Sequence, residues 1–161
     1  MARPYSDDDW TLATIEGGEN GPSVARFRTR LPPRTEREAW VHLIIIGWAY
    51  EPRDDSGLPN PDDHERMCAF EDAMEATVEA QDAGTQAVSI TGGGAREWRY
   101  YTRDTGKFLE AMNAALHGQP PYPLELDAFV DPEWDALAEL LPTRNEPVSP
   151  LGNGDTHRSG S

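Results

Sequence analysis

The chain has 161 residues and a net charge of −15, with 29 acidic against 14 basic side chains. This length predicts a single domain, and the negative charge argues against a nucleic-acid partner because phosphates would be repelled. No apolar run reaches the roughly 18 residues of a membrane span, so no membrane partner is expected. The only cysteine, Cys68, cannot form an internal disulfide, and no secretory signal begins the chain. We therefore expect a cytoplasmic protein.

The N-terminal part predicts a flexible lead followed by a β-hairpin. Residues 1–9 are polar and acidic, and a single α+β domain is expected over 10–142. Alternating segments over 10–15 and 23–31 flank a Gly-rich turn, which is typical of a hairpin.

Arginines line one face of the second hairpin strand. Arg26, Arg28 and Arg30 alternate there, and Arg34 and Arg37 follow. Such a set suits three roles: holding a carboxylate or phosphate ligand, pairing with an acidic helix of the same fold, or protecting an exposed edge strand. We favour the edge-strand role.

Six elements then alternate along the chain. They are strand 40–50, helix 62–82 with Asp62 or Asp63 as N-cap, strands 85–91 and 96–102, a helix capped by Asp104 or Thr105, and strand 124–130. This order predicts a ferredoxin-like fold, an antiparallel sheet with helices on one face. Asp131 is expected to cap a short last helix with Pro132 at its first position. Residues 143–161 predict a disordered tail.

The sequence carries no recognisable catalytic motif. No nucleophile elbow, P-loop or dinucleotide fingerprint occurs, and Gly92-Gly93-Gly94 is not followed by a helix that would bind phosphate. His64 and Cys68 lie four residues apart on the predicted helix and, with Asp63 nearby, are a possible metal pair, but no second pair accompanies them. We therefore expect no metal, no cofactor and no catalytic residue.

The helix over 62–82 is strongly acidic. It holds eight carboxylates and one basic residue, Arg66, and like charges four residues apart each cost a few tenths of a kcal/mol. A solvated face of an acidic protein is the simpler interpretation, and a surface for a basic protein partner is the functional one. The candidate partner-binding residues are Glu65, Glu71, Asp72, Glu75 and Glu79.

An alternative site lies on the predicted sheet. Arg96, Trp98 and Tyr100 share one face of their strand, and His42 lies on the central strand. If that face were open, these four residues would form a site for a small ligand or an enzyme reaction. If the N-terminal hairpin covered it, the aromatic side chains would be core, which is the interpretation we favour.

Four phrases of the sequence stand in an order that resembles the bacterial family called domain of unknown function 695. They are SGLPNPDD (56–63), AFEDAMEATVEA (69–80), GGGAREWRYYTRD (92–104) and DPEWDALAELLP (131–142). The matching residues are Gly57-Leu58-Pro59, Phe70-Glu71-Asp72, Arg96-Glu97 with Tyr100-Tyr101, and Asp131-Pro132 with Trp134. Phe70 replaces the usual Leu, and a Tyr near position 137 is missing.

The resemblance spans about residues 8–142 and has functional implications. The family is similar in arrangement to the regulator of ribonuclease activity B, an acidic protein that inhibits a ribonuclease by binding it. The resemblance thus implies a non-enzymatic, regulatory or inhibitor-like protein-binding module, with a basic partner such as a nuclease or a toxin. It carries over no catalytic residue, and the oligomeric state stays open.

Overall fold

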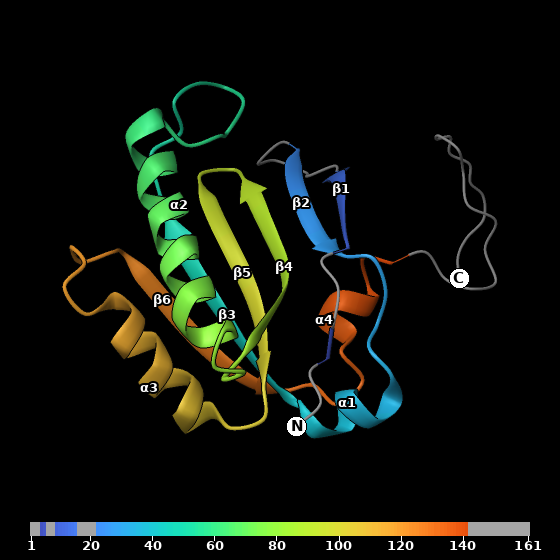
Figure 1. Ribbon diagram of the computed structural model, residues 1–161. Coiled ribbons are helices and arrows are strands. Elements are labelled where there is room, and N and C mark those ends of the chain that lie inside the picture. The colour runs from blue at the N-terminus through green and yellow to red at the C-terminus, as the bar shows by residue number, and fades with distance from the viewer. Residues whose placement is uncertain (1–3, 6–8, 16–21, 142–161) are drawn as a thin grey trace, which may run out of the picture.

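The computed structural model describes residues 4–5, 9–15 and 22–141, which build a mixed α/β structure on one antiparallel sheet (Figure 1). The strands are β1 (Trp10–Ile15), β2 (Ser23–Arg28), β3 (His42–Ala49), β4 (Thr85–Gly92), β5 (Ala95–Thr102) and β6 (Leu124–Val130). The helices are α1 (Arg34–Ala39), α2 (Pro61–Met74), the π-helical turn η1 (Glu75–Glu79), α3 (Thr105–Leu116) and α4 (Asp135–Ala138). The expected tail over 143–161 lies outside the described residues.

The six strands run in the order β1-β2-β4-β5-β3-β6, and every neighbouring pair is antiparallel. The predictions of a mixed α and β chain and of an antiparallel sheet are thus confirmed. β1 pairs with β2, but the segment that joins them, 16–21, lies outside the described residues. β2 lies between β1 and β4, so the predicted role of its arginines as protection for an edge strand is wrong.

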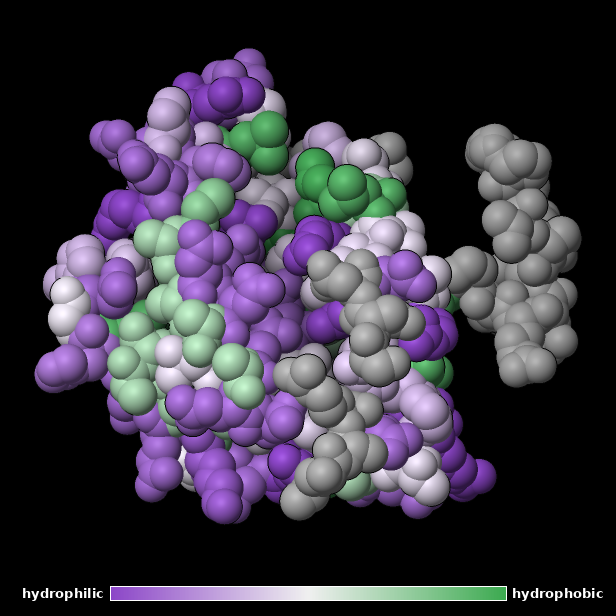
Figure 2. All heavy atoms as spheres, in the orientation of Figure 1, coloured by the Kyte–Doolittle hydropathy of each residue, from purple (hydrophilic) through white to green (hydrophobic). Residues whose placement is uncertain are grey.

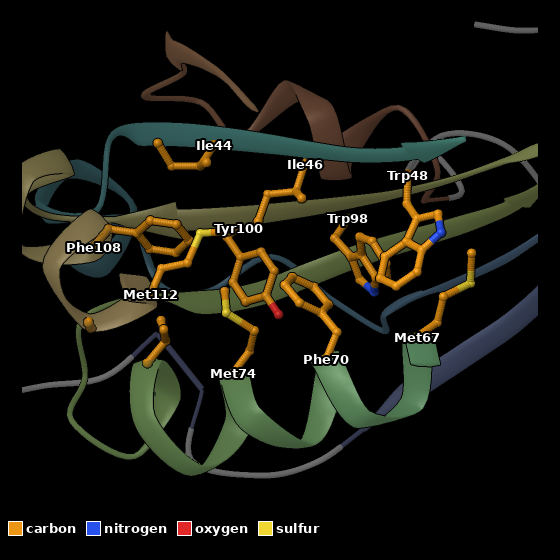
Figure 3. Close-up of a cluster of buried hydrophobic side chains, with 12 residues drawn as sticks. Ile44, Ile46, Trp48, Met67, Phe70, Met74, Trp98, Tyr100, Phe108 and Met112 are labelled. Carbon is orange, nitrogen blue, oxygen red and sulfur yellow. The ribbon is translucent and has the colours of Figure 1, made fainter. Parts of the chain in front are cut away.

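One face of the sheet is covered by α2 and α3 (Figure 3). Apolar side chains at three- and four-residue spacings on α2 pack on the sheet, as the sequence pattern predicts. From the helices this core takes Met67, Phe70, Met74, Val78, Phe108, Ala111 and Met112, and from the sheet Ile44, Ile46, Trp48, Trp98 and Tyr100.

The two predicted helices, α2 and α3, share one face of the sheet, but a second core that includes α4 fills the opposite face, so helices are not confined to one face. Trp134, at the start of α4, stacks on Tyr101 with ring centroids 3.7 Å apart, and its indole Nε1 donates to the Trp40 carbonyl oxygen at 3.0 Å. Tyr5, in the segment expected to be a flexible lead, is buried beside Trp134 and donates its hydroxyl to the Arg30 carbonyl oxygen at 2.7 Å. The apolar run of β3 needs cover on both sides, and these residues supply the second layer.

Several helix boundaries differ from the sequence prediction. α1 was not predicted; it is a short helix that begins after Pro33 and buries no side chain. The prediction of Asp62 or Asp63 as N-cap of α2 is wrong: Asn60 is the N-cap, its side chain accepts from Asp63 N at 2.9 Å, and α2 begins at Pro61. α4 begins at Asp135 instead of Pro132, while Asp104 caps α3 as predicted. None of the helices in the described ranges is both long and apolar enough to cross a membrane.

Candidate functional site

The acidic helix α2 lies across the sheet beside the arginines of β2, and a cleft of about 330 Å³ separates the two. The cleft gathers side chains from six elements, β1, β2, α2, η1, β4 and β5, which come from distant parts of the sequence. Its lining residues are Trp10, Arg26, Arg28, Glu71, Asp72, Glu75, Glu79, Gln86 and Arg96. The cleft therefore joins the two charge patterns that the sequence presents separately.

Glu71 is tied into the fold. Its carboxylate accepts a hydrogen bond of 2.6 Å from the indole Nε1 of Trp98, which is fully buried. The same oxygen lies 3.3 Å from Nη2 of Arg96, a side chain that is only 15% exposed. A hydrogen bond to a charged acceptor and a partly buried ion pair are both stronger than their exposed counterparts, so this contact anchors α2 on β5.

Arg28 forms a second link between sheet and helix. Its guanidinium is 3.9 Å from the Glu79 carboxylate, and its Nε donates to the Gln86 carbonyl oxygen at 3.0 Å. Trp10 lies against Arg26 and Arg28, with the guanidinium carbons 3.8 and 4.1 Å from its ring centroid. The alternative in which the arginines pair with the acidic helix of the same fold is thus the one that these contacts match.

The other arginines of the sequence pattern lie away from this cleft. Arg30 is 3.9 Å from Asp9, whereas Arg34 and Arg37 belong to α1. Arg34 pairs with Glu38 at 3.1 Å, and Arg37 donates to the Pro32 carbonyl oxygen at 2.7 Å. The five arginines therefore do not converge on one ligand.

The predicted partner-binding carboxylates divide into two sets. Glu71 and Glu79 face the sheet and pair with arginines, as described above. Glu65, Asp72 and Glu75 are exposed, and among the described residues none of the three forms an ion pair. Arg66, the only basic residue of α2, pairs instead with Asp63 at 3.5 Å. Glu75 and Glu79 belong to η1, which continues α2, and Asp72 and Glu75 also line the cleft. The three exposed carboxylates, which we call the outer side of α2, keep their negative charge without an ion pair in the described residues.

The alternative site residues do not come together. In the register of the central strands, Arg96 lies opposite Trp48, whereas His42 lies opposite Thr102. Six residues of extended strand separate these positions, or about 20 Å. Trp98 and Tyr100 are fully buried, and the elements that cover them are α2 and α3, whereas the favoured prediction was cover by an N-terminal hairpin (Figure 3).

A second hollow lies beside Arg96, between the loop that precedes α2 and the strand β2. Its volume is about 460 Å³, and Figure 2 shows hydrophobic surface on both sides of it. Apolar Val24, Leu58, Pro59 and Pro61 line it together with Arg53, His64, Thr91 and Arg96. The His64 ring Nε2 is 3.6 Å from Cys68 Sγ, but no group of three metal-binding side chains occurs in the part of the chain that the structure describes.

The comparisons with known proteins give one result. A family model described as a family of unknown function, DUF695, matches residues 8–141. The chain belongs to the DUF695 family. No curated protein and no solved structure matches it. The relation to the regulator of ribonuclease activity B stays a prediction.

In this DUF695 protein, the sequence motifs contact one another. Glu71 of the second motif binds Trp98 and Arg96 of the third, as described above. Tyr101 donates its hydroxyl to the Asp131 carboxylate at 2.6 Å, and the ring of Trp134 stacks on Tyr101, which joins the third motif to the fourth. The burial of Tyr101 and then its bond to Asp131 raise the pKa of this tyrosine.

The first motif of the DUF695 protein packs on the glycine turn between β4 and β5. Gly57 has a φ of 79°, and its carbonyl oxygen accepts from Gly94 N at 3.2 Å. A Cβ on Gly57 would lie 2.8 Å from Gly93 N, so only glycine fits. The motif residues thus hold the loops and α2 on the sheet.

Sequence reasoning missed Trp10 and Gln86 as members of the cleft. The β1–β2 register pairs Trp10 with Arg28, which places both side chains on one face, so a residue-by-residue alignment of the two strands would have found Trp10. Gln86 is buried, and its Nε2 donates to the Tyr100 hydroxyl at 3.2 Å. No signal in the sequence marks this residue.

Proposed function

We propose that this DUF695 protein is a non-enzymatic, inhibitor-like binding module, and that the outer side of α2 engages a basic surface of another protein. The observation that carries the proposal is the division of the α2 carboxylates. The fold uses Glu71 and Glu79, while Glu65, Asp72 and Glu75 stay exposed without an ion pair in the described residues.

The energetic argument rests on like charges along the helix. Glu75 lies four residues from both Glu71 and Glu79, and each such pair destabilises a helix by a few tenths of a kcal/mol. Arg96 and Arg28 compensate the charges of Glu71 and Glu79, but Glu75 has no ion pair in the described residues. A basic partner would supply the missing countercharge and would be steered toward the surface by the field.

The strand order and helix packing also support a proposal about the fold class. We infer that β3 to β6, with α2 and α3, form a ferredoxin-like unit extended by the paired strands β1 and β2. The order β4-β5-β3-β6 and the packing of both helices in one core support this inference.

The proposal is tested by affinity capture with the full chain as bait, followed by mass spectrometry of the retained proteins. One variant neutralises the outer side of α2 (Glu65→Gln, Asp72→Asn and Glu75→Gln). A control variant neutralises three exposed carboxylates elsewhere (Glu51→Gln, Asp55→Asn and Glu110→Gln), so both lose the same charge. We expect the wild-type chain to retain basic proteins that elute when salt is added. The control variant should retain the same proteins, and the α2 variant should not. Equal retention by both variants would refute the α2 surface.

A further inference from the structure

The edge strand β6 exposes more apolar side chain than any other element in the described residues. The described residues include six exposed large hydrophobic side chains, and three of them lie on β6: Leu126 at 39%, Phe129 at 50% and Val130 at 69% exposed. No described strand pairs with its outer side. Proteins usually protect such an edge with charged side chains, especially lysine, with proline or with a bulge. β6 (LELDAFV) has no lysine or proline, pairs with β3 in an unbroken register, and carries only two charges, both acidic.

The register identifies the main-chain groups that β6 presents at its outer side. Asp131, directly after the strand, donates its N–H to the Val41 carbonyl oxygen at 2.7 Å, and these residues continue the β3–β6 register. Hydrogen-bonded pairs alternate along an antiparallel ladder, so the odd-numbered residues of β6 bond to β3. The N–H and C=O groups of Leu126, Ala128 and Val130 therefore point outward.

The side chains of β6 differ between the two faces of the sheet. Leu126 is paired with Ile46, a residue of the core under α2 and α3, so Leu126, Ala128 and Val130 lie on that face. Glu125 and Asp127 lie on the other face, opposite Gly47 and Ile45. Both carboxylates are exposed, and neither forms an ion pair within the described residues. Phe129 follows them on that face, opposite Leu43, so the edge combines an apolar row with a row of two carboxylates and one aromatic ring.

We propose that β6 binds an extended segment of a partner protein in which apolar and basic residues alternate, by adding that segment to the sheet as a further strand. Main-chain hydrogen bonds to Leu126, Ala128 and Val130 would supply affinity. The apolar side chains of the segment would continue the row of Leu126 and Val130, and its basic side chains would face Glu125 and Asp127.

Charge argues against a second copy of the chain as the occupant. In an antiparallel pairing of two β6 strands, outward-pointing residues must pair, so Asp127 faces an odd-numbered residue of the other copy. In every register with good overlap, a carboxylate of one copy therefore lies opposite a carboxylate of the other. The contacts are Asp127 with Asp127, Glu125 with Asp127, Glu125 with Asp131, or Asp127 with Asp131. Like charges directly opposite each other destabilise a sheet, and each copy carries a net charge of −15.

This inference goes beyond the proposed function, because it concerns a different surface and does not depend on the carboxylates of α2. A short synthetic peptide of alternating valine and lysine is the probe, and a peptide of alternating valine and glutamate is the control. Binding to the full chain is followed by amide chemical shifts and hydrogen exchange. We expect only the lysine peptide to bind, with new protection of the Leu126, Ala128 and Val130 amides.

Ala128→Pro is the decisive variant. Proline removes an N–H that points outward, so it leaves the bonds to β3 in place and is tolerated at a sheet edge. We expect this variant to have the same thermal unfolding temperature as the wild type and to bind the lysine peptide at least tenfold more weakly. A second variant, Glu125→Lys with Asp127→Lys, is expected to prefer the glutamate peptide.

Two results would overturn the proposal. The first is that the lysine peptide binds Ala128→Pro as tightly as it binds the wild type, or that it protects amides outside β6 from exchange. The other is a peptide-free dimer in solution that Ala128→Pro dissociates, because the edge would then serve a second copy. Loss of binding by the α2 variant but not by Ala128→Pro would support the α2 surface and refute the β6 edge, so the two proposals fail separately.

Discussion

The two sides of α2 carry the same kind of side chain but use it differently. On the inner side, Glu71 and Glu79 face arginines of the sheet, and Glu71 also binds a buried indole. Asp72 and Glu75 line the same cleft but are more exposed, and they have no ion pair in the described residues. The comparison shows that the carboxylates of this helix are not equivalent: two pair with arginines of the sheet, and the exposed ones form no ion pair in the described residues.

The inner and outer carboxylates should therefore differ in their contribution to stability. Ion pairs of exposed side chains contribute between zero and about 1 kcal/mol, whereas a buried group that loses its partner costs several times more. The environment of each carboxylate, more than its place in the acidic sequence, decides its effect.

The largest effect is expected for Glu71→Ala. The change leaves the buried Trp98 indole without its acceptor and Arg96 without its ion pair. We expect a loss of about 2–3 kcal/mol in the free energy of unfolding, measured by chemical denaturation. Asp72→Ala, one residue further along the helix, is the control and should change it by less than about 0.5 kcal/mol. Equal losses would remove the distinction between the two sides.

The next effect concerns alkaline pH and Tyr100. Burial raises the pKa of Tyr100, and the charges of Glu79, Glu71 and Glu75 raise it further, while the hydrogen bond from Gln86 lowers it. The tyrosine thus stays protonated in the folded chain at a pH where the unfolded chain ionises it. Stability is complete below the unfolded pKa of about 10 and falls above it, by about 1.4 kcal/mol per pH unit for this residue.

Two variants separate the causes of this alkaline loss. Tyr100→Phe should make the fall in unfolding free energy above pH ~10 shallower by about 1.4 kcal/mol per pH unit. Glu79→Gln should lower the pKa of Tyr100 toward its ordinary value, as followed by tyrosinate absorbance, because it removes the largest of the three carboxylate effects. Asp72→Asn should leave the titration unchanged. A Tyr100 titration insensitive to Glu79→Gln would contradict the inner position of that carboxylate.

The smallest effect on stability is expected for the outer set. Neutralising Glu65, Asp72 and Glu75 together should change the free energy of unfolding by no more than about 0.5 kcal/mol. A small gain is the expected direction, because Glu75 no longer repels Glu71 and Glu79. Thermal unfolding measures this, and a large loss would show that these carboxylates belong to the fold.

The sequence predicted the parts of this structure that depend on local pattern. The spacing of Met67, Phe70, Met74 and Val78 predicted the buried side of α2, and the strand β6 begins and ends at the predicted residues. These features depend on periodicity along one element, which a single sequence displays.

The parts that the sequence did not predict depend on contacts between distant elements. The packing of Trp134 on Tyr101 covers the second face of the sheet, and it joins residues more than thirty positions apart. The division of the α2 carboxylates depends on where β2 lies relative to the helix, and nothing in either segment fixes that position. The pairing of arginines with the helix was therefore an open alternative until the sheet order was known.

The affinity of the full chain for the basic protein recovered by capture is the measurement that tests the central claim most directly. It is compared at several salt concentrations for the wild type, the outer α2 variant and the control variant with three other carboxylates neutralised. We predict that the α2 variant binds about tenfold more weakly, or about 1.4 kcal/mol, with a shallower salt dependence, while the control binds like the wild type. Equal weakening in both variants would contradict the claim, because the attraction would then come from net charge and not from the outer side of α2.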